Sequence, residues 1–357
     1  MKKSNNIAVI FTIWILSGLF CWGQNNNAKH WGYDINSVSI FTNKEYNTNT
    51  LSGYTIGGSW LKAGITYNIN NTLFLSGGIY YQSFYGDAEL QSRHPFVLKA
   101  RYKPNENFSI SMGDIHSSEH HYLPNYLYNT DLLLLDPIEE GISLKYRNAK
   151  INIESWIDWE KYIVAGSPFR EEFLFGTSAQ YKLFDAEKHK NTLNFALLII
   201  HKGGEIDASP LTVQTLLNTR FGFNQNYRLN NMVSLNIGSD LLNYFNNSGT
   251  PEIPFKVGYA FNIFGGVQLN DWQLSIDYWH SNKFYGIKGD PYFSNYINGV
   301  VLPKRNILSF AQIWKKNISK SATIAFDNRL LYEFSKTKMD LYSTLKLVIF
   351  INNHSFN

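Results

Sequence analysis

The sequence predicts an all-β protein: a transmembrane, antiparallel, up-and-down β-barrel of about sixteen strands, with fourteen as the alternative count. Three observations predict this fold. The chain of 357 residues is rich in aromatic residues (16%) and poor in charged ones (17%). Apolar and polar residues alternate over stretches of about ten residues or more, the length that a tilted strand needs to cross a membrane. Short turns and long polar connections follow one another along the chain, as they do in outer-membrane barrels.

The N-terminal segment predicts export. Two lysines precede an apolar run, 7–20, that is short for a membrane-spanning helix but suits a signal peptide. We expect a cleaved secretory signal peptide at 1–23 and a single transmembrane barrel domain at 24–357; the alternative is a buried N-terminal helix. The only cysteine, Cys21, lies in the leader, so the exported chain has no thiol for a disulfide or a cysteine zinc site.

Alternation is clear in the segment 271–283. Trp272 and Tyr278 end an apolar face, whereas the opposite face is polar except for Trp279. An apolar stripe with an aromatic residue at each end is what a lipid-facing strand requires. A soluble sandwich also alternates, but its strands are usually about five or six residues long. The predicted strands are 35–41, 55–67, 72–85, 95–103, 108–115, 140–147, 150–159, 172–183, 191–203, 213–227, 231–245, 255–268, 271–283, 304–315, 319–333 and 338–351.

The connections support this scheme, although 35–41 and 304–315 alternate poorly. Short turns contain Asn, Asp and Pro, which tolerate or preset the dihedral angles of tight turns. Because the strand number is even, we expect both ends of the barrel on the periplasmic side and the long loops outside. A barrel of this size leaves an aqueous lumen. The long loops are expected near 42–54, 86–93, 116–139, 160–171, 204–212, 246–254 and 285–302.

The leader ending in Trp-Gly-Gln, the strand pattern and the length of the exported chain resemble porin-like outer-membrane barrels of Gram-negative bacteria. The Gln that directly follows the expected cleavage site resembles the pattern found in exported proteins of the Bacteroidetes. The resemblance covers nearly the whole exported chain and implies a bacterial outer-membrane location, with outer-membrane lipid, lipopolysaccharide and small hydrophilic solutes as partners. The chain departs from the pattern at its end, because Phe356 stands one residue before the terminus, where such barrels commonly end on an aromatic residue.

The stretch IHSSEHHYLP, 115–124, opens the longest connection. The resemblance implies that this third long loop, 116–139, folds into the barrel and narrows the pore. Four leucines at 132–135 would then pack against the wall, whereas on the surface they would form an unexplained apolar patch. The candidate constriction residues are Glu119, His120, His121, Asp131, Asp136 and Glu139.

A metal site is the competing interpretation of this loop, because its imidazoles and carboxylates suit zinc or another divalent ion. The sequence does not match the H-E-x-x-H motif, and Pro124 argues against a long helix. The weak metal candidates are Asp114, His116, Glu119 and His120.

A nucleophilic triad is the third interpretation. Ser117 or Ser118 lies close in sequence to His120 and His121, but a serine–histidine–acid relay is defined by spatial geometry and not by adjacency. We therefore assign no catalytic residue, no enzymatic activity and no cofactor, with an outer-membrane hydrolase as the residual alternative.

Fixed charges are predicted on the inner wall of the barrel. The alternation of the strands 95–103 and 140–147 places their basic side chains on the inner face, where they would form one positive wall. The strand 150–159 places two acidic side chains on the same face. Such charges set selectivity for ions and charged solutes. The alternative is that they pair with one another and stiffen the barrel. The lumen-wall candidates are Lys99, Arg101, Lys103, Lys145, Arg147, Glu154 and Asp158.

The charge balance excludes a nucleic-acid partner. Loss of the leader lowers Lys+Arg from 32 to 30 against 28 acids, which leaves a net charge of +2 (30 − 28). The function expected from sequence is an outer-membrane, porin-like channel for passive diffusion of small hydrophilic solutes, narrowed by loop 116–139. The alternative is a non-conducting barrel that serves as a structural or partner-binding subunit of a larger outer-membrane complex.

Overall fold

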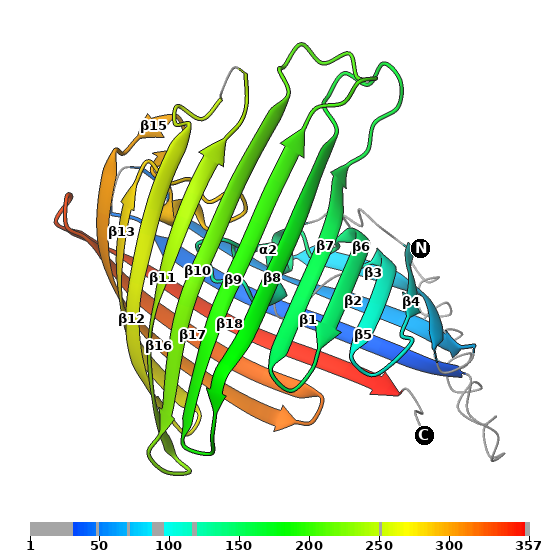
Figure 1. Cartoon of the computed structure of the whole chain (residues 1–357), viewed down its shortest axis with the longest axis horizontal. Helices are drawn as coiled ribbons and strands as arrows, with labels where there is room; N and C mark the ends of the chain where they lie inside the picture. Colours follow the sequence, from blue (N-terminus) through cyan, green and yellow to red (C-terminus); the bar gives the residue numbers. More distant parts are fainter. Residues whose placement is uncertain are drawn as a thin grey trace, which may run out of the picture.

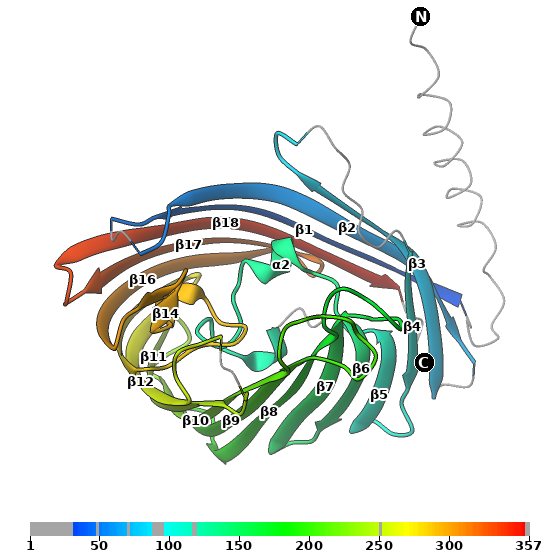
Figure 2. The same cartoon turned by 90° about the horizontal axis from the view of Figure 1, so that it is seen from above.

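The computed structural model describes residues 31–47, 50–69, 72–87, 96–115, 120–249 and 252–353. The predicted signal peptide at 1–23 lies outside these residues. Sixteen strands form one closed antiparallel barrel in which each strand pairs with its neighbours in the wall and β1 pairs with β18 (Figures 1 and 2). The predicted fold class is confirmed.

The bounds of the strands agree with the predicted scheme to within a few residues, except that β1 is longer at both ends and β16 continues to Ser319. The predicted end of the strand 304–315 was wrong, because the chain reverses only at 320–321. The wall consists of β1 (Trp31–Glu45), β2 (Tyr54–Asn68), β3 (Leu73–Phe84), β4 (Phe96–Tyr102), β5 (Phe108–Asp114), β6 (Glu140–Arg147), β7 (Ile151–Lys161), β8 (Glu172–Asp185), β9 (His189–Lys202), β10 (Gln214–Arg228), β11 (Val233–Asn246), β12 (Val257–Leu269), β13 (Trp272–Asn282), β16 (Lys304–Ser319), β17 (Ala322–Glu333) and β18 (Lys338–Asn353).

Short turns join the strands at the rim where β1 begins and β18 ends, and longer connections lie mostly at the other rim. We call them the short-turn rim and the long-loop rim. In outer-membrane barrels the short turns are periplasmic and the long loops extracellular. No helix in the described ranges is long and apolar enough to cross a membrane.

The outer face is apolar, as a lipid-facing wall requires. Phe96 is 72% exposed, Leu98 70% and Ile276 53%, and each of them alternates with an inward-facing residue. The inner face is not uniformly polar. Val38 and Ile40 of β1 point inward and are buried, which blurs the alternation of this strand and explains why the sequence marked it as weak.

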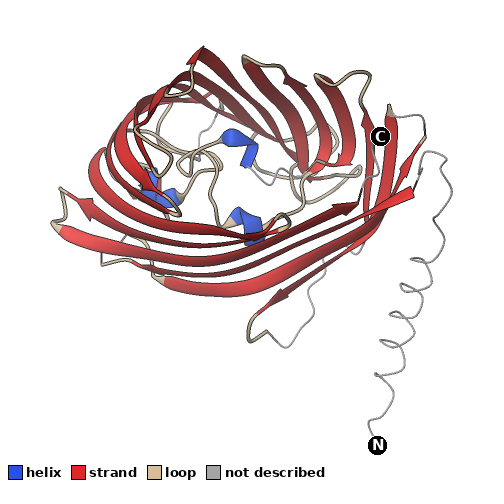
Figure 3. Ribbon diagram, turned by 90° about the horizontal axis from the view of Figure 1, so that it is seen from below, coloured by secondary structure: helices blue, strands red, loops and turns tan. Residues whose placement is uncertain are grey.

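Two long loops enter the lumen (Figure 3). The first is loop L3, described at residues 115 and 120–139, which contains η1 (His120–Tyr122) and α2 (Leu132–Leu135). The second is loop L7 (283–303), which contains η2 (Pro291–Phe293) and the hairpin of β14 (Tyr296–Ile297) and β15 (Val300–Val301). Their helical turns lie inside the ring of strands (Figure 3). The hydrophobic core of the protein therefore lies inside the barrel, between these loops and the wall.

Candidate pore constriction

Loop L3 packs against β1, β2 and β3 through the leucines of α2. Leu133 and Leu134 are buried in one cluster with Val38, Ile40 and Trp60. The Trp60 indole N–H donates a hydrogen bond of 2.7 Å to the Leu133 carbonyl. Burying leucine side chains in this way stabilises the loop by about 2 kcal/mol each. The apolar run therefore anchors the loop on the inner wall.

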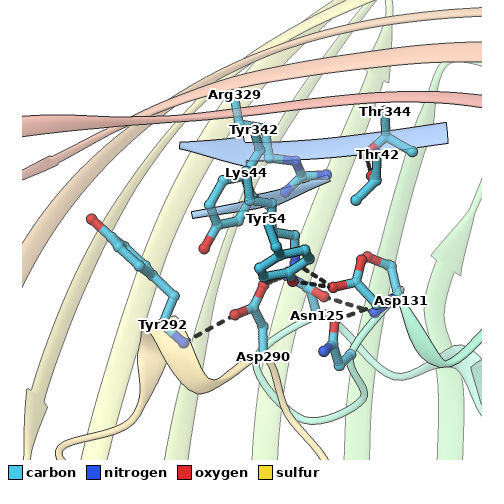
Figure 4. Close-up of polar contacts among 12 residues, drawn as sticks. Thr42, Lys44, Tyr54, Asn125, Asp131, Asp290, Tyr292, Arg329, Tyr342 and Thr344 are labelled. Atoms are coloured by element: carbon cyan, nitrogen blue, oxygen red, sulfur yellow. Dashed lines mark hydrogen bonds and ion pairs between the residues drawn. The ribbon is translucent and has the colours of Figure 1, made fainter. Parts of the chain in front are cut away.

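Lys44 of β1 joins both loops to the wall. Its ammonium lies 2.7 Å from an Asp131 carboxylate oxygen of loop L3 and 3.1 Å from an Asp290 oxygen of loop L7. The Tyr54 hydroxyl also donates to Asp131, and the Lys44 ammonium lies 4.7 Å from the centre of the Tyr342 ring. Figure 4 shows the two carboxylates converging below Lys44. We call Lys44, Asp131 and Asp290 the loop junction.

The two loops also bind each other directly. The backbone N–H of Asn129 donates to the Lys288 carbonyl at 2.8 Å, and the backbone N–H of Asp290 donates to the Asn125 carbonyl at 2.9 Å. Lys288 in turn forms an ion pair with Glu160 of β7. The loops therefore cross the lumen as one bound unit with contacts on opposite parts of the wall.

Loop L7 has a second anchor on β16 and β17. Arg305 is fully buried and forms two hydrogen bonds, of 3.0 and 2.8 Å, with the two Glu333 carboxylate oxygens. Its other terminal nitrogen donates to the carbonyls of Tyr292 and Ser294 in loop L7. Each nitrogen of this guanidinium therefore donates a hydrogen bond either to the wall or to loop L7.

His121 anchors the start of loop L3 on β7. The imidazole is completely buried, stacks on Trp156 with ring centres 3.8 Å apart, and places its nitrogens 3.0 Å from oxygens of Glu139 and Glu154. Burial alone lowers the pKa of the imidazole, but the Glu139 and Glu154 carboxylates outweigh it and raise the pKa to about 9. The imidazolium therefore donates to both carboxylates at neutral pH.

The raised pKa of His121 predicts an alkaline weakening of this anchor. The folded-state pKa of about 9 exceeds the ordinary value of 6.5, so the stabilisation is complete below about pH 6.5 and is lost as the pH rises through 9. The shift corresponds to about 3 kcal/mol. We expect the urea midpoint of unfolding to fall between pH 7 and pH 10. An H121Q variant should lack this part of the pH dependence; an equal fall in both proteins would contradict the assignment.

Two cavities lie side by side on the short-turn side of loop L3. The first, of about 350 Å³, is lined by Lys62, Lys99, Arg101, Asp34 and Asp114, together with neutral residues of β1 to β4 and Phe350 of β18. The second, of about 270 Å³, lies beside it between β4 and β7. Its charged lining residues are Lys103, Glu106, Lys145, Arg147 and Glu154. We call the two cavities the vestibule.

The structure places five of the predicted wall bases and one acid, Glu154, in the vestibule. Lys145 forms an ion pair of 3.0 Å with Glu154, which agrees with the alternative prediction that the wall charges pair with one another. Asp158 lies closer to the long-loop rim on β7, is buried, and accepts a hydrogen bond from the backbone N–H of Glu140.

The structure separates the predicted constriction residues into several environments. His121 and Glu139 meet at the β7 anchor, Asp131 lies at the loop junction, and Asp136 is exposed just after α2. His120 begins η1. Glu119 lies outside the described residues.

The predicted metal ligands are tested only in part. His116 and Glu119 lie outside the described residues, and Asp114 is ion-paired with the Lys62 ammonium. Within the described ranges, no group of three or more His, Cys, Asp or Glu side chains is arranged to hold a metal ion. The metal hypothesis for this stretch stays a prediction.

Sequence reasoning missed Lys44, Arg305 and the inward course of loop L7. A signal for loop L7 was present, because Phe284, Tyr292 and Phe293 are large apolar residues within an expected surface loop, and all three are buried. The same argument had been applied to the four leucines of loop L3. Nothing local marks Lys44 or Arg305, because their partners lie far away in the sequence.

Comparison with solved structures shows outer-membrane barrels. The loop L8 deletion mutant of OmpT, an outer membrane protein of Vibrio cholerae, aligns with a TM-score of 0.53 and 10% identity over 90% of this chain and 99% of that one. OprD of Pseudomonas aeruginosa aligns at 0.52 and 9% identity over 92% and 95%. OpdK of the same organism aligns at 0.52 and 8% over 91% and 100%. At these identities the likeness shows the fold alone.

Comparison at the sequence level gives one family. The model of the family described as lipid A 3'-O-deacylase-type matches residues 23–354. No curated protein matches the chain.

Proposed function

We propose that this chain, which belongs to the lipid A 3'-O-deacylase-type family, forms a narrow channel through the bacterial outer membrane for small hydrophilic solutes. The observation that carries the proposal is the lumen itself. Wall side chains fill a barrel of about eight strands but not one of this size. Here the bound loops L3 and L7 narrow the lumen, and a charged vestibule of two cavities stays open on the short-turn side.

The direction of the channel follows from the rims. The short-turn rim would face the periplasm and the long-loop rim the outside, after export by the leader at 1–23. Solutes would then meet loops L3 and L7 before they reach the vestibule. Outer-membrane lipid and lipopolysaccharide would surround the apolar outer face.

Single-channel recording tests the proposal. The purified barrel, inserted in a planar bilayer, is expected to give stable ohmic current steps. A barrel that inserts but never conducts would contradict the channel and support the alternative, a closed barrel that acts as a structural or partner-binding subunit in the outer membrane. Insertion is verified separately by protection of the strands from protease in liposomes.

A second candidate is hydrolysis of a lipid acyl ester, which the description of the family suggests. One observation favours it. His201 of β9 lies at the long-loop rim, alternates with inward-facing residues, and places its Nδ1 3.0 Å from the Thr215 hydroxyl of β10. Both side chains therefore face the lipid near its headgroups. Within the described ranges His201 contacts no carboxylate, so an acid to orient the imidazole is lacking.

The second candidate has a direct test. Purified protein is incubated with lipid A in mixed micelles, and released acyl chains are measured by mass spectrometry. If the candidate is correct, the wild-type protein releases acyl chains and H201A and T215A do not. No release by the wild-type protein contradicts it and leaves the channel unaffected.

A further inference from the structure

We propose that Lys99 and Arg101 in the vestibule form a binding site for small organic oxyanions, that is, carboxylates or phosphate esters. The inference rests on the proposed channel function, because it names the class of solute that the vestibule receives. Both side chains come from β4 and point into the cavity of about 350 Å³ on the short-turn side of loop L3.

The charged side chains that line this cavity give it a net positive charge. Three bases and two acids line it, which gives a net charge of +1 (3 − 2). One of the acids, Asp114, is buried and forms an ion pair with Lys62. Lys99, Arg101 and the single acid Asp34 are left, so the remaining charge is positive and comes from β4.

The acidic residues of the adjacent cavity do not neutralise this positive charge. Its acid nearest to loop L3, Glu154, is bound by both His121 and Lys145 at 3.0 Å. Glu106 lies at the turn between β4 and β5, opposite the two further bases Lys103 and Arg147. This cavity again has three bases and two acids, so its net charge is also +1 (3 − 2). The positive potential therefore extends across the whole vestibule.

The two β4 side chains, Lys99 and Arg101, keep hydrogen-bond donors that are not used by the described residues. Within the described ranges, Lys99 forms no hydrogen bond and no ion pair within 4.0 Å, although Asp114 and other charges act on it at longer range. The buried Arg101 Nε has no hydrogen-bond partner among the described residues. The Arg101 guanidinium lies 5.2 Å from the centre of the Phe74 ring, which holds the group in place without using its N–H donors.

These two side chains suit an oxyanion ligand. A guanidinium offers a planar pair of N–H donors that fits a carboxylate or phosphate, and a nearby ammonium adds a point charge. Thr66, Ser76 and Asn36 line the same cavity with neutral polar groups. A volume of about 350 Å³ is at the lower end of ligand pockets, so the site suits a small solute and not a polymer.

Bilayer recordings with three variants test the site. We expect the wild-type channel to be more permeable to chloride than to potassium in a KCl gradient. In the K99A/R101A variant the ratio of chloride to potassium permeability should fall about fivefold, because each positive charge in the lumen attracts chloride and repels potassium. K188A removes an exposed charge at a turn of the same rim and should leave the ratio unchanged. R101K keeps the charge but loses the paired donors.

Binding is measured separately with succinate and inorganic phosphate as probes, by current block and by calorimetry on the detergent-solubilised barrel. We expect R101K to weaken binding at least tenfold while its ion selectivity stays close to that of the wild-type channel. If succinate binds and phosphate does not, the site takes carboxylates; the reverse result assigns it to phosphates.

The two proposals fail in different ways. A barrel that never conducts overturns the channel, but calorimetry still decides the site. A conducting wild-type barrel whose selectivity and probe binding are unchanged in K99A/R101A overturns the oxyanion site and leaves the channel standing. Calorimetry that shows no binding of either probe also overturns the site.

Discussion

Replacement of Lys44 by methionine is expected to release loops L3 and L7 from β1 and to make the channel wider and its current less steady. The ammonium is buried and forms ion pairs with both Asp131 and Asp290. Without it, two carboxylates stay close together in a low-dielectric site. Removal of one partner of a buried ion pair commonly costs about 3–5 kcal/mol. Part of this cost is relieved when the carboxylates separate and take up water, which requires that the loops move.

Single-channel conductance and urea unfolding in liposomes measure this effect. The matched control is the triple variant K44M/D131N/D290N, in which no uncompensated charge remains. It should recover most of the lost stability, because amide groups can be buried at a smaller cost than ionised carboxylates. If K44M conducts and unfolds like the wild-type protein, the junction does not hold the loops.

Removal of the Glu333 carboxylate is expected to destabilise the barrel most strongly. In E333A the fully buried Arg305 guanidinium loses both of its carboxylate hydrogen bonds and keeps only the carbonyls of loop L7. We expect a loss of about 3–5 kcal/mol in the free energy of unfolding, measured by the change in tryptophan fluorescence in urea. E333Q retains one acceptor oxygen and should lose only about 1–3 kcal/mol.

Glu172 provides the matched control for a carboxylate outside the packed lumen. It pairs with Lys161 and Lys202 at the long-loop rim, and its side chain is 18% exposed. Partly exposed ion pairs contribute about 1 kcal/mol or less, so E172A should lower the unfolding free energy far less than E333A. Equal losses in the two variants would show that burial of Arg305 does not decide the effect.

The strands could be predicted from the sequence because lipid imposes a strict period of two on the outer face. The departures from that period have a common physical cause. Trp279 interrupts a polar inner face, and the structure places it against Tyr126 of loop L3 and Phe293 of loop L7. Val38 and Ile40 meet α2 in the same way. Inward apolar residues mark the places where the loops contact the wall.

The candidate site was only partly predictable. The resemblance to porin-like barrels predicted the inward fold of loop L3, and alternation found the bases that line the vestibule. The loop junction was hidden, because Lys44 lies 87 residues from Asp131 and 246 residues from Asp290 in the chain. A pattern that repeats every two residues carries no information about contacts over such distances. The dense histidines of loop L3 drew attention to metal chemistry, whereas His121 is held between two carboxylates.

The position of Lys44 on the first strand has a consequence for assembly. Loop L7 leaves the sheet at β13 and returns at β16, whereas Lys44 reaches it from β1, which pairs with β18 at the seam of the barrel (Figure 1). In a growing, still open sheet these parts lie apart, and closing so long a loop is entropically costly until the seam forms. The ion pair between Lys44 and Asp290 is therefore expected to form late. We expect the wall to close first and the ion pair that fixes loop L7 across the lumen to form afterwards.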